Sequence, residues 1–222
     1  MYNSVELSKS ISITLRKYLN ESVNNYRQLI DLAKQYDYET FIRKTDNLTS
    51  TYDILYRGMS STELVDKSFF SDYVGHAEQY GEYVDGIIYN YSDVLHFGDD
   101  TFDNLRRHFE NISKKELLDI YSYYFKNYRL LDAMVGDFSD ETGVIRFVKT
   151  FLKSNIPYTK VQQQKVKNDL LIPIMLYYAQ TKGKNIIQFT GGDYADYGGA
   201  DEFVVNDISR YDRLSDIWKS AN

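Results

Sequence analysis

Three separate segments of the chain carry residues suited to binding and cleaving a charged ligand. The first is Arg57, which is followed by Gly58 at the end of an expected strand. A guanidinium can hold a phosphate through two parallel hydrogen bonds, and a glycine lets the backbone approach a ligand closely. An Arg-Gly pair alone fits a solvated strand end equally well, so it indicates a site only together with other segments.

The second segment is 69–81, in which Ser71 ends a short extended piece and Tyr80 lies on the helix expected after it. A hydroxyl at a strand end and an aromatic ring on the next helix can form one wall of a pocket. A helix N-cap followed by a core tyrosine gives the same pattern. His76 has no acidic partner at helical spacing on this helix, and we expect it on the protein surface.

The third segment is a loop rich in glycine and aspartate, 190–201, which leads directly into Glu202 at the start of an expected strand. A carboxylate fixed at a strand end beside a loop is a common catalytic geometry, and an exposed strand-entry glutamate is the alternative. Asp193, Asp196 and Asp201 alternate with glycines but lack the spacing of an EF-hand. We therefore expect no metal site, and a calcium-binding loop is the alternative.

Alternating helical and extended patterns indicate the elements that position these residues. Apolar residues three and four positions apart predict helices over 1–50, and β-forming runs bounded by turn residues predict strands. The expected strands are 53–57, 69–71, 86–91, 184–189 and 202–207. Further helices are expected between about 99 and 182, one of them opened by a capping box from Ser113 to Glu116. We predict an α+β fold with an N-terminal helical layer, 1–50, and a core domain, 51–222, that carries a helical insertion at about 99–182.

Composition narrows the chemistry. The 222 residues include no cysteine, which excludes disulfides, thiolate zinc sites and a cysteine nucleophile. There are 26 Lys and Arg residues against 32 Asp and Glu residues, and the net charge of −6 argues against binding nucleic acid by phosphate neutralisation. No run of apolar residues is long enough to span a membrane, since about 20 are needed. We expect a soluble, cytoplasmic protein.

Taken in order, the three segments resemble the motifs of the ADP-ribosyltransferase superfamily. Tyr56-Arg57-Gly58 resembles the first motif of its arginine–serine–glutamate branch. The stretch from Phe70 to Tyr80 resembles the second motif, in the form found in poly(ADP-ribose) polymerases, and 201–207 resembles the glutamate strand. The resemblance covers about 51–98 and 183–210, and it implies the split β-sheet core of that family.

The resemblance also implies roles for these residues, with NAD as the co-substrate and no metal. Glu202 would stabilise the cation that forms on the ribose, and Arg57 would bind the phosphates or the ribose of NAD. Ser71 would form a hydrogen bond with the ribose or with Glu202. The Gly58 backbone would face the nicotinamide carboxamide, and Tyr80 would stack on the nicotinamide ring.

Two tyrosines of the glycine-rich loop, Tyr194 and Tyr197, would contact the acceptor. The implied activity is that of a mono-ADP-ribosyltransferase, a glycosyltransferase that modifies a macromolecule, with a protein acceptor favoured over nucleic acid. A non-catalytic binding module on the same fold and an NAD glycohydrolase are the alternatives. Ala200 stands where arginine-modifying members carry a second glutamate, so the acceptor residue stays open. The cytoplasm would be that of a host if the protein is viral or a secreted effector, and the oligomeric state stays open.

Overall fold

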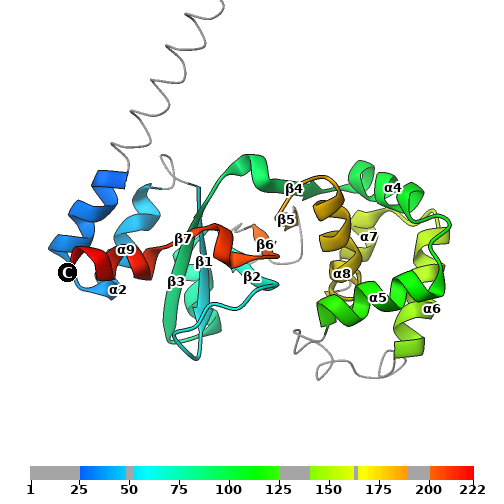
Figure 1. Cartoon of the computed structure of the whole chain (residues 1–222), viewed down its shortest axis with the longest axis horizontal. Coiled ribbons are helices and arrows are strands. Elements are labelled where there is room, and N and C mark those ends of the chain that lie inside the picture. The colour runs from blue at the N-terminus through cyan, green and yellow to red at the C-terminus, as the bar shows by residue number, and fades with distance from the viewer. Residues whose placement is uncertain (1–25, 49–52, 126–140, 163–164, 190–200) are drawn as a thin grey trace, which may run out of the picture.

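The computed structural model describes residues 26–48, 53–125, 141–162, 165–189 and 201–222. These residues form one seven-stranded sheet with helices at both of its ends (Figure 1), which confirms a mixed α+β fold. The strand order is β4-β5-β6-β2-β1-β3-β7, and every neighbouring pair is antiparallel except β4–β5. The strands are β1 (Asp53–Met59), β2 (Ser68–Ser71), β3 (Tyr83–Tyr89), β4 (Val94–Phe97), β5 (Ile186–Phe189), β6 (Glu202–Val205) and β7 (Asp212–Arg213).

The helices fall into two groups on either side of the sheet in Figure 1. One group holds α4 (Asp99–His108), α5 (Lys114–Phe125), α6 (Glu141–Lys153), α7 (Tyr158–Gln162) and α8 (Lys165–Thr181). The other holds a helix over 26–35, α2 (Tyr38–Thr45), the 3₁₀ turn η1 (Asp46–Leu48) and α9 (Leu214–Ala221). Between strands lie α3 (Val74–Ala77) and three more 3₁₀ turns, η2 (Glu78–Tyr80), η3 (Tyr91–Asp93) and η6 (Ile208–Arg210). The helical layer expected over 1–50 is confirmed over 26–48, and residues 1–25, 49 and 50 lie outside the described residues.

The helices predicted between about 99 and 182 form the connection between two parallel strands. They follow β4 and precede β5, and parallel neighbours need a crossover of this kind because a tight turn cannot join them. The predicted capping box is present, since the Ser113 N–H donates to Glu116 Oε2 at 3.0 Å and the Glu116 N–H to Ser113 Oγ at 3.1 Å. α8 runs through Pro173, and the buried Tyr121 hydroxyl donates to the Leu170 carbonyl one turn before the proline. Apolar side chains of these helices pack onto β4, β5 and β6 through Phe97, Ile187 and Val204.

The N-terminal helices and the C-terminal helix close the opposite end of the sheet together. Phe41 of α2 and Leu214 of α9 belong to the same buried cluster as Ile54 and Tyr56 of β1. The side chain of Asn222 donates to the Ala33 carbonyl at 3.0 Å, which ties the two ends of the described chain together. The amphipathic α9 was not predicted from the sequence, because eight residues at a chain end give little periodicity to detect.

A fully buried carboxylate, Asp85 of β3, joins these elements. Its two oxygens accept hydrogen bonds from the Tyr38 hydroxyl at 2.9 Å, its neighbour's N–H in Gly86 at 2.8 Å, and both the N–H and the hydroxyl of Ser215 at 3.0 and 2.7 Å. Arg213 supplies the counter-charge, with Nη2 at 2.9 Å. Burial and then the charge of Asp85 raise the pKa of Tyr38 far above its ordinary value, so this phenol remains a donor. One side chain thus holds β3, β7, α2 and α9 in place.

Two glycines let the segment α3–η2 lie directly on β1. A Cβ on Gly58 would stand 1.9 Å from the carbonyl oxygen of Ala77, and a Cβ on Gly81 would stand 2.2 Å from the carbonyl carbon of Met59. Both clashes are with backbone atoms, which cannot turn aside as a side chain would. The absence of side chains at these two positions therefore sets how closely His76, Ala77 and Tyr80 approach the sheet.

We predict that Asp85→Asn lowers the free energy of unfolding by about 3 kcal/mol, because it leaves the partly buried Arg213 without its counter-charge and faces an NH₂ group toward other donors. Urea denaturation followed by circular dichroism measures the loss. Asp212→Asn, an exposed neighbour on β7, is the matched control and should change stability by less than about 0.5 kcal/mol. Equal stability of the two variants would contradict the role given to Asp85.

For Gly58→Ala we expect a loss of about 1–3 kcal/mol, the usual cost of forcing extra volume into a packed interior. The melting temperature of the variant reports it. Gly98→Ser adds a Cβ at a helix N-cap where no heavy atom lies within 4 Å, so it should leave the melting temperature nearly unchanged. A Gly58→Ala protein as stable as Gly98→Ser would show that the close approach is not needed.

Candidate functional site

A cavity of about 260 Å³ lies between β1, β2 and the segment α3–η2. Its lining residues are Tyr56, Arg57, Gly58, Phe69, Phe70, Ser71, His76, Ala77, Tyr80 and Glu202. All the cofactor-binding and catalytic residues predicted from the sequence are in this set, although they come from three distant segments. Tyr194 and Tyr197, predicted to contact an acceptor, lie outside the described residues, and so does Ala200.

Strand register places the central residues of the cavity in one row. Tyr56 of β1 is the cross-strand partner of Ser71 of β2, and Ser71 is the partner of Glu202 of β6. Directly paired residues in an antiparallel sheet project to the same face, with Cβ atoms about 5 Å apart. The hydroxyl of Ser71 and the carboxylate of Glu202 therefore face the same cavity as neighbours. The other side of β6 is held by β5, where Phe189 pairs with Glu202.

Arg57 bridges the place where β1 and β2 separate. The strands are joined at the Tyr56–Ser71 pair, and beyond it Arg57 Nη1 donates to the Phe69 carbonyl at 2.6 Å. One of the five N–H donors of the guanidinium is used in this contact, which fixes the plane of the group at the cavity wall. The half-buried position keeps the charge partly shielded from water. Such a group can bind an anionic or hydroxyl-rich ligand in a defined orientation.

Ser71, His76 and Tyr80 form a continuous chain of hydrogen bonds along the cavity wall. Ser71 Oγ lies 3.1 Å from His76 Nδ1, and His76 Nε2 lies 3.2 Å from the Tyr80 hydroxyl. The expectation of a surface position for His76 was wrong, because only 2% of it is exposed. The ring nitrogens lie next to the hydroxyl groups of Ser71, on the preceding strand, and of Tyr80, four residues later, and not next to an acidic side chain on the same helix. Tyr80 itself is 55% exposed and forms the open rim of the cavity.

Asp201, the residue before Glu202, is held by hydrogen bonds of its own. The N–H of Asp201 donates to Asp72 Oδ1 at 3.1 Å, and Gln188 Nε2 donates to Asp201 Oδ2 at 2.5 Å. Burial raises the pKa of Asp72 above its ordinary value, and the charge of Asp201 adds to this effect while the Asp201 N–H opposes it. The sequence pattern singled out neither Asp72 nor Gln188 as functional. Together they fix the entry of β6 and hence the position of Glu202.

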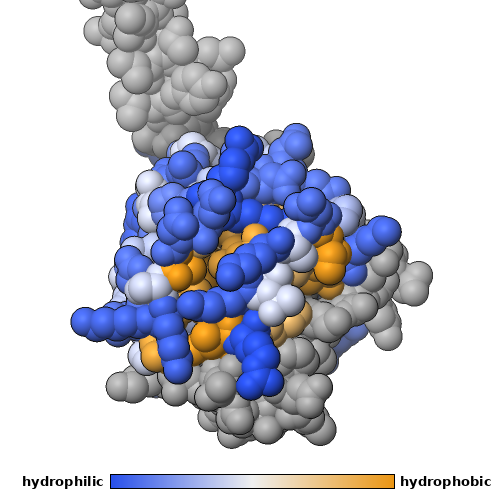
Figure 2. Space-filling model, turned by 90° about the vertical axis from the view of Figure 1, so that its right-hand side faces the viewer, coloured by the Kyte–Doolittle hydropathy of each residue, from blue (hydrophilic) through white to orange (hydrophobic). Residues whose placement is uncertain are grey.

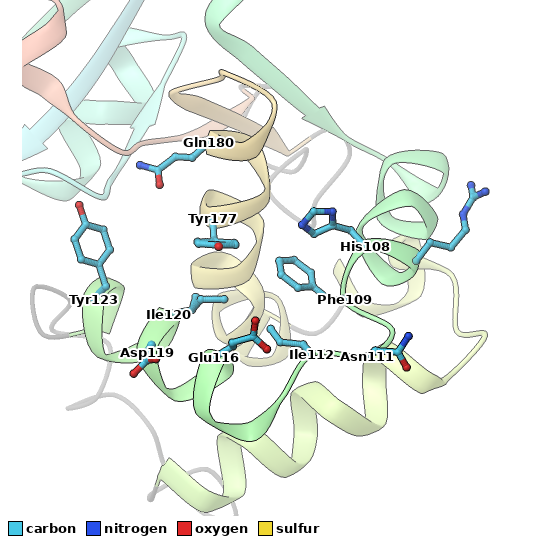
Figure 3. A pocket seen from close by; sticks show the side chains of 11 residues that line it. His108, Phe109, Asn111, Ile112, Glu116, Asp119, Ile120, Tyr123, Tyr177 and Gln180 are labelled. Carbon is cyan, nitrogen blue, oxygen red and sulfur yellow. The ribbon is translucent and has the colours of Figure 1, made fainter.

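A larger cavity of about 580 Å³ lies in the helical group, between α4, α5 and α8 (Figure 3). Phe109, Ile120 and Tyr177 form its apolar wall, and Glu116 beside them is the carboxylate already used in the capping box. On this end of the molecule, apolar residues emerge in patches between hydrophilic ones (Figure 2). The larger cavity holds none of the residues that the sequence motifs brought together, so we take the smaller one as the candidate site.

Within the described residues, no cluster of three or more histidine, cysteine, aspartate or glutamate side chains is arranged to hold a metal ion. None of the helices in the described ranges combines the length and apolar character needed to cross a bilayer.

Comparisons of this chain with protein-family models, with curated proteins and with solved structures gave no significant match.

Proposed function

We propose that this protein is an NAD-dependent mono-ADP-ribosyltransferase that modifies a macromolecular acceptor, most simply a protein. The observation that carries the proposal is the meeting of Arg57, Ser71 and Glu202 in one cavity, with Tyr80 at its rim. The order of the motifs in the sequence predicts the same set of residues. On this proposal the sheet is the split β-sheet of the ADP-ribosyltransferase family, opened between β1 and β2.

The dimensions of the cavity suit the nicotinamide end of NAD. Its volume of about 260 Å³ is below the range of about 300–1,000 Å³ typical of pockets that enclose a whole drug-sized ligand. A flat ring could enter against the exposed Tyr80, which offers a stacking surface, while the rest of the dinucleotide extends outward. Gly58 lines the cavity, and its backbone would face the nicotinamide carboxamide.

Cleavage of the bond between nicotinamide and ribose would be assisted by a carboxylate at the position of Glu202. The bond between the nicotinamide nitrogen and the ribose breaks, its electron pair leaves with nicotinamide, and positive charge builds on the sugar. A carboxylate that bonds a ribose hydroxyl stabilises this charge and orients the sugar, as in glycoside cleavage. An acceptor nucleophile then bonds to the same carbon and gives up its proton.

Arg57 and Ser71 supply binding and orientation rather than bond making. Arg57 is held by the Phe69 carbonyl and would pair with the NAD phosphates or ribose. Ser71 is the cross-strand neighbour of Glu202, and its hydroxyl would hydrogen-bond the same ribose or Glu202 itself. A glycohydrolase would use the same groups with water as the acceptor, and the fate of ADP-ribose separates the two activities.

Glu202→Gln should lower the rate of nicotinamide release by about 100- to 1000-fold, because it removes the charge that stabilises the transition state and keeps the side-chain volume. The affinity for NAD should change little, since this interaction strengthens mainly in the transition state. Nicotinamide release is followed by chromatography, and NAD affinity by calorimetry. Glu63→Gln, an exposed loop residue, is the control. Release by Glu202→Gln within a few-fold of the control would refute the assignment.

Arg57→Lys should weaken NAD binding by roughly 10- to 100-fold, because lysine keeps the charge but loses the planar fork. The dissociation constant for NAD measures the effect, and circular dichroism verifies that the fold persists. Arg210→Lys, at an exposed position outside the cavity, should bind as the parent does. If Arg57→Lys binds NAD as tightly as Arg210→Lys does, Arg57 does not bind NAD through a bidentate contact.

A further inference from the structure

His76 is the one buried histidine of the candidate site, and the reaction proposed above gives it no task. It lines the cavity, and both of its ring nitrogens have hydroxyl neighbours at hydrogen-bonding distance, Ser71 on Nδ1 and Tyr80 on Nε2. The ring also packs edge-on against Tyr80, with 5.3 Å between ring centroids and 73° between their planes. The imidazole is thus fixed in position and in rotation.

The hydrogen bonds of Ser71 make the state of His76 decisive for the cavity. A hydroxyl has one proton to donate and two lone pairs that accept. One lone pair of Ser71 Oγ already accepts the N–H of Tyr73 at 3.1 Å. If His76 Nδ1 carries its proton, it donates to the second lone pair, and the Ser71 proton must point elsewhere. If Nδ1 carries no proton, the Ser71 hydroxyl donates its proton in a hydrogen bond to Nδ1.

Tyr80 selects between these two arrangements. The tautomer of a neutral histidine is set by the hydrogen bond that the other ring nitrogen makes. A phenol is a stronger acid than an alcohol and is therefore the better donor of the two hydroxyls that flank the ring. When Tyr80 donates to Nε2, the proton of the ring stays on Nδ1, and Nδ1–H donates to Ser71.

We infer that His76 is a positioning residue that turns the hydroxyl proton of Ser71 into the cavity, toward Glu202. On this inference Tyr80 donates to His76 Nε2 and His76 Nδ1 donates to Ser71. The hydroxyl proton of Ser71 is then left to point toward the carboxylate of Glu202, the residue paired with Ser71 across β2 and β6. A hydrogen bond donated to a carboxylate fixes the direction in which that carboxylate points. The consequence of the inference rests on the proposed function: this series of hydrogen bonds would hold the Glu202 carboxylate in the orientation that faces the ribose.

The tautomer of His76 tests the inference without any need for activity. The chain contains three histidines, so nitrogen-15 NMR of the rings is readily assigned with a His76→Gln variant. At a pH where the ring is neutral, we expect the proton on Nδ1 in the parent and a shift of the population toward Nε2–H in Tyr80→Phe. A parent with the proton on Nε2, or a tautomer that Tyr80→Phe leaves unchanged, would overturn the inference.

Kinetics test the consequence for Glu202. Asparagine can place an N–H near the position of Nδ1, whereas glutamine reaches only toward that of Nε2. His76→Gln should therefore lower kcat for nicotinamide release by about tenfold or more with little change in KM, and His76→Asn should restore most of that rate. His96→Gln, on β4 and outside the cavity, is the control and should leave kcat unchanged.

The double variant decides whether His76 acts through Ser71. In a Ser71→Ala background, His76→Gln should cause no further loss, because groups that act as a unit are not additive. If the losses in kcat of the two single variants multiply in the double variant, His76 acts independently of Ser71, and the positioning role is overturned. A parent protein that releases no nicotinamide would refute the proposed function, while the NMR result would still decide the direction of the hydrogen-bond chain.

Discussion

The antiparallel pairing of β2 with two different strands is the constraint on which the site depends. β2 has four residues, and all of them pair with β6, while β1 is joined to it at the Tyr56–Ser71 pair. This arrangement aligns Tyr56, Ser71 and Glu202 across three strands. It also lets β1 separate from β2 immediately beyond that pair, where Arg57 and the segment α3–η2 line the opening. A slip of one residue in either register would turn Ser71 or Glu202 to the opposite face of the sheet.

The rest of the molecule holds this short strand in place. On one side, β6 is pinned by β5 and by the helices of the crossover, whose apolar side chains pack on Val204 and Ile187. On the other side, β1 is held by β3 along seven residue pairs, and β3 is tied to the N- and C-terminal helices through Asp85. Gly58 and Gly81 then allow α3–η2 to close over the opening. The cavity is therefore a product of contacts between segments far apart in the sequence.

The approximate positions of the strands that carry the site could be predicted from the sequence, because their β-forming runs have clear limits: the first two end near Gly58 and Ser71, and the third starts at Glu202. The helical crossover was predicted from its periodicity and from the capping box at Ser113. β4 was not predicted, since four residues that include the polar His96 give no clear alternation, and their extended form comes from pairing with β5. The burial of His76 was also not predicted, because it depends on tertiary packing. It depends on how closely α3 lies on β1, and this distance is set by backbone contacts that no spacing of residues reveals.

We propose that the cavity lined by Arg57, Ser71 and Glu202 cleaves NAD and transfers ADP-ribose to a macromolecule. The most direct measurement uses two preparations of NAD, one labelled in the nicotinamide ring and the other in the adenine ring, each incubated with the protein and a cell lysate. The account predicts that the nicotinamide label is released as a free small molecule, while the adenine label becomes covalently attached to protein. If the nicotinamide label is released and the adenine label also stays in a small molecule, free ADP-ribose, the protein is a glycohydrolase instead. Intact NAD in both preparations would contradict the account.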